Sequence, residues 1–105
     1  MISRSQISEL AENISKKFNT KKIILFGSYA YGKPNSNSDL DLCIVADLGT
    51  KRKIELLRDI RREINLSVQY PIDVLLYDVK EFSERSIHQN TLEYKIVKQG
   101  LLING

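Results

Sequence analysis

Residues 22–46, KIILFGSYAYGKPNSNSDLDLCIVA, form the stretch of sequence that decides the fold. Its first five residues are a short, mostly apolar run that Gly27 ends, a pattern typical of a buried β-strand. Ser28–Tyr31 is expected to form a short helical turn, and residues 32–38, rich in Gly, Pro and Asn, a loop. Residues 39–46 begin with strict polar–apolar alternation and end apolar, which predicts a second strand.

The rest of the chain alternates between helical and strand patterns. Apolar stripes predict helices over residues 5–18 and 50–66. Tyr70-Pro71 breaks the second pattern, and the apolar residues 72–77 predict a third strand. Residues 79–99 read as one or two helices. This order predicts an α/β fold with a single sheet of about three strands, covered by helices.

The apolar positions also predict which side chains reach the core. In the helix over residues 50–66, one side carries four apolar residues: Ile54, Leu57, Ile60 and Ile64. Near the C-terminus we expect three core contacts: Leu92, Ile96 and Val97. Gly100 suits the end of the last helix, and residues 101–103 suit a short extended tail.

Length and composition limit the possible functions. The chain has 105 residues, 42% of them hydrophobic and 28% charged, so we expect one globular domain over residues 1–105. A net charge of +3 does not indicate a strongly basic nucleic-acid scaffold, and direct nucleic-acid binding is not expected. No apolar window suits a membrane span or a signal peptide, so we expect a cytoplasmic protein. So short a domain suits an open catalytic cleft or one that a partner completes.

Three aspartates stand in predicted strands, where aspartate is rare. Asp39 and Asp41 are two residues apart, so both should point to one face of the sheet with Cα atoms roughly 6.6 Å apart. Asp73 is second in the next predicted strand. Three carboxylates on one face would repel each other, and divalent cations would neutralise them. Taken singly, each could instead be a turn residue or a solvated strand residue; together they favour metal binding.

Gly27-Ser28 adds a candidate phosphate-binding element. A glycine after a buried strand allows close backbone approach, and a following helical turn with a hydroxyl could hold phosphate oxygens. The stretch from Gly27 to Lys33 also matches most of a P-loop, but Pro34 stands where the magnesium-binding Ser or Thr should be. We also include Ser38, next to Asp39, among the candidate nucleotide-binding residues.

Gly27-Ser28, ten further residues and then Asp39-Leu40-Asp41 resemble the signature of the minimal nucleotidyltransferases of the DNA polymerase beta-like superfamily. The resemblance covers most of the chain and implies an α/β (α+β) fold with a small mixed sheet. It implies that Asp39, Asp41 and Asp73 hold two Mg²⁺ ions and that Gly27 and Ser28 cradle the triphosphate of ATP. Many relatives carry arginines where this chain has Tyr29 and Tyr31.

Short stand-alone members of this family resemble the antitoxins of toxin–antitoxin pairs. The implied partner is a HEPN-domain ribonuclease toxin, and the implied reaction is transfer of AMP to a tyrosine of that toxin. The alternative is a catalytically weak or inactive binding module that neutralises the toxin by occlusion. A third, less favoured alternative is a nucleotidyltransferase for a small molecule, against which the absence of a second domain argues.

Overall fold

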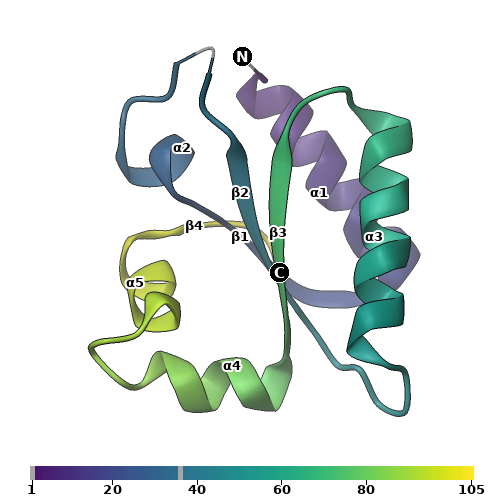
Figure 1. The fold of residues 1–105 in the computed structure, drawn as a ribbon, viewed down its shortest axis with the longest axis vertical. Coiled ribbons are helices and arrows are strands. Elements are labelled where there is room, and N and C mark those ends of the chain that lie inside the picture. Colours follow the sequence, from purple (N-terminus) through teal and green to yellow (C-terminus); the bar gives the residue numbers. More distant parts are fainter. Residues whose placement is uncertain (1, 36) are drawn as a thin grey trace.

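The computed structural model describes residues 2–35 and 37–105; Met1 and Ser36, the latter within the predicted loop, lie outside the described residues. Helices and strands alternate along the chain as predicted (Figure 1). Their bounds are α1 Arg4–Phe18, β1 Thr20–Phe26, α2 Ser28–Tyr31, β2 Leu40–Ala46, α3 Lys53–Ser67, β3 Ile72–Asp78, α4 Val79–Ser86, α5 Leu92–Gln99 and β4 Leu101–Asn104. Across these residues no helix combines the length and apolar composition that crossing a bilayer requires.

The sheet is mixed, with the strand order β3-β2-β1-β4. β1 runs antiparallel to β2 and to β4, whereas β2 and β3 are parallel and joined through α3. The predicted α/β class is confirmed, but the sheet has four strands in the described residues rather than three. The predicted tail is strand β4, and four residues are too few for a periodic strand pattern to show in the sequence.

Two apolar layers cover the two faces of the sheet (Figure 1). Leu40, Leu42 and Ile44 face α1 and α3, while the alternate residues Cys43 and Val45 face α4 and α5. This division follows from the two-residue repeat of a strand. Asp41, which shares its side of β2 with Cys43, therefore belongs to the face that α4 and α5 cover.

The ends of α1 show how local sequence sets the helix bounds. The helix begins one residue earlier than predicted, because Ser3 and Gln6 form a capping box in which each side chain bonds the other's backbone N–H. Asn19 ends the helix in the left-handed conformation, with φ 52°.

Some predicted core contacts are wrong. The predicted buried side of α3 includes Ile54, but Ile54 is 60% exposed, and Leu56 packs on the sheet instead, with Ile60 and Ile64. Apolar residues lie on more than one side of this helix, so spacing alone cannot tell which side faces the sheet. In α5, Ile96 is buried as predicted, whereas Leu92 and Val97 are exposed.

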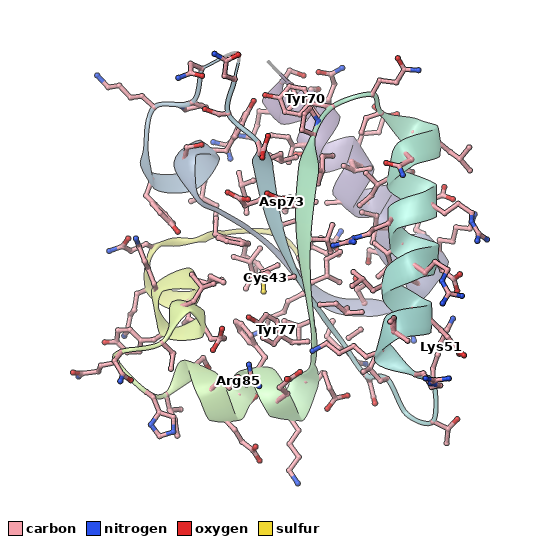
Figure 2. All side chains as sticks on the ribbon, viewed as in Figure 1. Cys43, Lys51, Tyr70, Asp73, Tyr77 and Arg85 are labelled. Atoms are coloured by element: carbon pink, nitrogen blue, oxygen red, sulfur yellow. The ribbon has the colours of Figure 1, made fainter. Side chains whose placement is uncertain are left out.

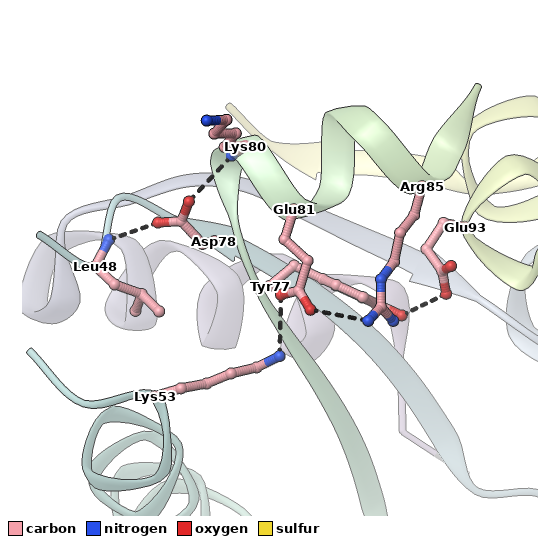
Figure 3. A network of polar contacts seen from close by, with 8 residues as sticks. All are labelled: Leu48, Lys53, Tyr77, Asp78, Lys80, Glu81, Arg85 and Glu93. Carbon is pink, nitrogen blue, oxygen red and sulfur yellow. Dashed lines mark hydrogen bonds and ion pairs between the residues drawn. The ribbon is translucent and has the colours of Figure 1, made fainter. Parts of the chain in front are cut away.

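A network of polar contacts closes the end of the sheet where β2 and β3 finish (Figure 3). The carboxylate of Asp78 accepts hydrogen bonds from the backbone N–H of Leu48 and of Lys80, each at 3.1 Å. The Lys53 ammonium lies 3.1 Å from the Glu81 carboxylate, which joins α3 to α4. Every carboxylate here has a donor within reach.

Helix α5 is held to the sheet by one buried hydrogen bond in the same region (Figure 3). The Tyr77 hydroxyl on β3 donates to the Glu93 carboxylate at 2.7 Å. Glu93 is only 8% exposed, and burial together with this bond raises the pKa of Tyr77 well above its usual range. Loss of the bond would leave a buried carboxylate oxygen without a donor, which is costly.

We therefore expect Tyr77→Phe to lower the free energy of unfolding by about 1–3 kcal/mol. Urea denaturation at neutral pH measures this change. The matched control is Tyr94→Phe, which removes a hydroxyl from a tyrosine on α5 outside this bond. Equal losses for the two variants would show that the Tyr77–Glu93 bond does not hold α5.

Candidate active site

Asp41 and Asp73 lie side by side in the sheet. They are directly paired residues of the parallel strands β2 and β3. Paired residues of adjacent strands point to the same face, so both carboxylates lie on the side of the sheet that carries α4 and α5. In Figure 2, Tyr70, Asp73, Cys43 and Tyr77 follow one another from the top of the sheet downward. The two aspartates are therefore at the end opposite the polar network of Figure 3.

The electrostatics of this end centre on Asp41. Burial raises the pKa of the half-buried Asp41 carboxyl, and the negative charges of Asp73 and Asp39 and a hydrogen bond with Asp73 raise it further. Asp39 is exposed and directly precedes β2. Within residues 2–35 and 37–105, none of these three aspartates forms an ion pair with a basic side chain. The cluster thus concentrates negative charge that no neighbouring side chain neutralises.

The donor chemistry of the cluster fits a hard cation, since carboxylate oxygens are the ligands that Mg²⁺ prefers. The described residues do not hold a preformed metal cage: no three His, Cys, Asp or Glu side chains surround a common point. A cation between Asp41 and Asp73 would remove the repulsion that helps to raise the pKa of Asp41.

Gly27 lies against Asp41. It follows Phe26, the partner of Asp41 across β1 and β2, and has φ 74°, which favours glycine. A Cβ atom at this position would stand 2.1 Å from Oδ2 of Asp41 and 3.0 Å from its Cγ. Only a glycine lets the backbone pass this close to the carboxylate.

Ser28 begins helix α2 directly after Gly27 and is half-buried. The first residues of a helix have N–H groups without intrahelical partners, here those of Ser28 and Tyr29. These donors and the Ser28 hydroxyl directly follow Gly27 in the chain, and Gly27 lies against the Asp41 carboxylate. The donors would suit an anionic ligand such as a phosphate, and the neighbouring carboxylates would suit a cation bound to that ligand.

Two tyrosines join the loops around the cluster, an arrangement that we call the tyrosine link. The hydroxyls of Tyr29, on α2, and Tyr70, before β3, are hydrogen-bonded to each other. The Tyr70 hydroxyl also donates to the carbonyl oxygen of Ser38 at 2.7 Å, next to Asp39. The bond to Tyr29 raises the pKa of Tyr70 to about 12, so the link stays protonated at neutral pH. It connects the turn with Ser28 to the segments with Asp39 and Asp73.

Ser38 has a structural contact of its own. Its hydroxyl accepts the backbone N–H of Asn35 at 3.0 Å, and its own N–H donates to the carbonyl of Asn35 at 3.0 Å. These bonds close the turn that leads into β2. The role of Ser38 in nucleotide binding stays a prediction.

Cys43 follows Asp41 by two residues on the same face of β2 and is fully buried. Burial and the charge of Glu93 raise the pKa of its thiol to about 12. Because the thiolate is the reactive form, this thiol is inert at neutral pH and acts as a small apolar side chain.

Sequence reasoning missed the tyrosine link. Tyr29 stood out only as a departure from a family pattern, and Tyr70 only as the residue before a proline. The two residues are 41 positions apart in the sequence, and no local sequence pattern predicts a contact at that separation. Only the fold, which sets α2 beside the start of β3, brings them together.

Residues 7–98 match the nucleotidyltransferase domain family. The chain belongs to this family. That match covers nearly all the elements described above, from α1 to α5. The chain is accordingly an enzyme of the nucleotidyltransferase class.

Two curated relatives come from Methanocaldococcus jannaschii, and both are assigned, by name, as protein adenylyltransferases. One is 32% identical over 92 residues, which cover 83% of this chain and 88% of the relative. The other is 34% identical over 87 residues, which cover 78% of this chain but only 59% of the relative.

Two solved structures share the fold. A nucleotidyltransferase-like protein from Sulfolobus solfataricus has a TM-score of 0.63 at 18% identity, over 93% of this chain and 76% of its own. A toxin–antitoxin complex solved with AMP-PNP has a chain with a TM-score of 0.51 at 24% identity, over 99% of this chain and 74% of its own. At these identities the likeness shows the fold alone.

The raised pKa of Asp41 predicts a pH-dependent cost in stability. Folding makes this carboxyl bind its proton more tightly, so its ionisation favours the unfolded chain. With EDTA present, we expect Asp41→Asn to be more stable than wild type at neutral pH. The difference should vanish as the pH falls below 3.8, the ordinary pKa, where both states of the wild type are protonated. Thermal unfolding across pH measures this, and Asp59→Asn on α3 is the control.

The tyrosine link predicts a second effect on stability. Tyr70→Phe keeps the ring but removes the hydroxyl that bonds both Tyr29 and the Ser38 carbonyl. We expect a lower free energy of unfolding, since two hydrogen bonds disappear. In hydrogen exchange, the backbone amides of residues 28–32 and 37–40 should exchange faster than in wild type. Unchanged exchange in both segments would contradict the link.

Proposed function

We propose that this chain is a protein adenylyltransferase that transfers AMP from ATP to a hydroxyl group of a partner protein. The observation that carries the proposal is the unneutralised cluster of Asp39, Asp41 and Asp73 beside the donors of Gly27-Ser28. The two named relatives, assigned as protein adenylyltransferases, support it. We further propose that the acceptor is a tyrosine of a HEPN ribonuclease toxin, for which this chain is the antitoxin.

Asp39, Asp41 and Asp73 would hold two Mg²⁺ ions, and Gly27 and Ser28, with Ser38, would contact the triphosphate. When bound, such a pair of ions neutralises the charge that develops on the attacking and leaving oxygens. The chain's own contribution is placement: the β2–β3 register sets two carboxylates side by side, and Gly27 lets the triphosphate-binding turn approach them.

The reaction is an in-line displacement at the α-phosphorus of ATP. The acceptor oxygen forms a new bond to that phosphorus while the bond to the bridging oxygen of the β-phosphate breaks. AMP is left on the acceptor, and pyrophosphate departs with the bonding electron pair. The exposed Asp73 is the residue of the cluster that we assign to the acceptor side, where it would take the hydroxyl proton.

The exposure of Asp39 and Asp73 suits an acceptor group that a partner protein brings to the site. We propose one catalytic domain over residues 1–105 that acts in the cytoplasm and relies on the toxin to supply the acceptor surface. The related fold in a toxin–antitoxin complex with AMP-PNP supports a toxin partner and a nucleotide donor. Direct contact with nucleic acid has no part in the proposed reaction.

Transfer of label from [α-³²P]ATP to the co-expressed product of the neighbouring reading frame tests the proposal. Wild type with Mg²⁺ should label that protein. Asp39→Asn plus Asp41→Asn should reduce labelling by a factor of about 100 or more, because the charge stabilisation at the phosphorus is lost. Asp59→Asn, which removes an exposed carboxylate from α3, is the matched control. No transfer by wild type, or equal transfer by the double variant, would overturn the proposal.

A binding module that acts by occlusion alone is the second candidate. One face of α3 that carries apolar and arginine side chains favours it, made of these residues: Ile54, Leu57, Arg58, Arg61, Arg62, Asn65 and Leu66. In the described part of the chain its three arginines form no ion pair, so an acidic, partly apolar segment of a partner would suit it. If the double aspartate variant still binds the toxin but no longer neutralises it, occlusion alone is rejected.

A further inference from the structure

We propose that Lys95 is a nucleotide-binding residue that contacts the phosphates of ATP from helix α5, and that the ring of Tyr31 holds it in place. The inference rests on the proposed function, since it concerns the donor of that reaction. It adds a third element to the site: besides the sheet and the turn at Gly27-Ser28, α5 supplies a positive charge.

The position of the Lys95 ammonium is the first observation. Its Nζ lies 4.8 Å from the centroid of the Tyr31 ring, so the side chain reaches from α5 to α2. Ser28 and Tyr31 are three residues apart in α2, and residues at this spacing share one side of a helix. The ammonium is therefore held on the side of α2 from which the Ser28 side chain projects.

The second observation is that α5 is fixed on the same face of the sheet as the aspartates. Ile96, next to Lys95, is fully buried between α5 and the sheet, and Glu93 is bonded to Tyr77. Asp41, Asp73 and Tyr77 all lie on this face. In the view of Figure 1, α2 and α5 both lie to the left of β2 and β3, with α2 above α5. Lys95 thus reaches α2 from a helix that packs on the face of the sheet carrying Asp41 and Asp73.

The third observation is the charge balance. A nucleoside triphosphate and three carboxylates would bring many negative charges to this end of the sheet. Lys95 is exposed and forms no ion pair with any described carboxylate, so its charge is available. A cation over an exposed aromatic ring is held only weakly, so the ammonium can turn to phosphate oxygens at little cost. The ring keeps an otherwise flexible side chain near the site.

The chain provides a matched comparison on the same helix. Lys98 lies over the Tyr94 ring, with Nζ 5.6 Å from the centroid. Tyr94 belongs to α5 itself, so this contact stays within the helix and does not reach α2. The two lysines therefore share residue type, helix and aromatic contact, and differ in that only Lys95 reaches α2, the helix that begins at Ser28.

Binding of Mg²⁺ with AMP-PNP, measured by isothermal titration calorimetry at low ionic strength, tests the inference without any partner. Lys95→Gln should raise the Kd about fivefold to tenfold, the effect of losing one charge-assisted contact to phosphate. Lys95→Arg should restore most of the affinity, and Lys98→Gln should bind as wild type does. Tyr31→Leu should weaken binding less than Lys95→Gln does. The melting temperature of Lys95→Gln should stay within about 1 °C of wild type, since an exposed side chain is removed.

Adenosine separates a phosphate contact from a base contact. Its affinity should be equal in wild type and Lys95→Gln, because it carries no phosphate. An equal loss for adenosine and AMP-PNP would overturn the assignment to phosphate. Wild-type affinity of Lys95→Gln for AMP-PNP would overturn the inference and leave the proposed function standing. Failure of the wild type to bind AMP-PNP with Mg²⁺ would overturn the proposed function, and the inference with it.

Discussion

The rest of this site depends on two carboxyl groups that repel each other, those of Asp41 and Asp73 on the neighbouring parallel strands β2 and β3. The register of β2 and β3 pairs Asp41 with Asp73 and leaves no freedom to separate them along the sheet. Gly27, which directly follows β1, lies against the Asp41 carboxylate so closely that any Cβ atom there would overlap it. The tyrosine link joins α2 to the segments that precede β2 and β3, and so holds the chain on either side of these carboxylates in position.

Among the described residues, acidic side chains have hydrogen-bond or cationic partners at one end of the sheet and lack cationic partners at the other. At one end Asp78, Glu81 and Glu93 each accept a hydrogen bond or face a cation. At the other, the described aspartates are left without cationic partners. Natural proteins keep such unfavourable clusters where function needs them and obtain their stability elsewhere. In this chain the stabilising contacts lie in the two apolar layers and the network at the far end.

Much of the fold could be predicted because it depends on local patterns. The apolar run before Gly27 and the alternation after Ser38 specify β1 and β2, and the spacing of Asp39 and Asp41 indicated the acidic cluster. What failed depends on contacts between distant segments. Strand β4 exists through its pairing with β1, and the buried side of α3 is chosen by the sheet, not by the helix. The contact of Tyr70 with Tyr29 and that of Lys95 with Tyr31 likewise follow from packing between distant segments.

The burial of Cys43 makes this protein convenient for site-specific labelling. It is the single cysteine of the chain, and its thiol, fully buried with a pKa raised to about 12, does not compete for thiol-directed reagents in the folded state. A cysteine introduced on an exposed position, for instance on the outer side of α3, would then be the one reactive thiol. Fluorescent or spin labels could report from a chosen surface without replacing a native core residue.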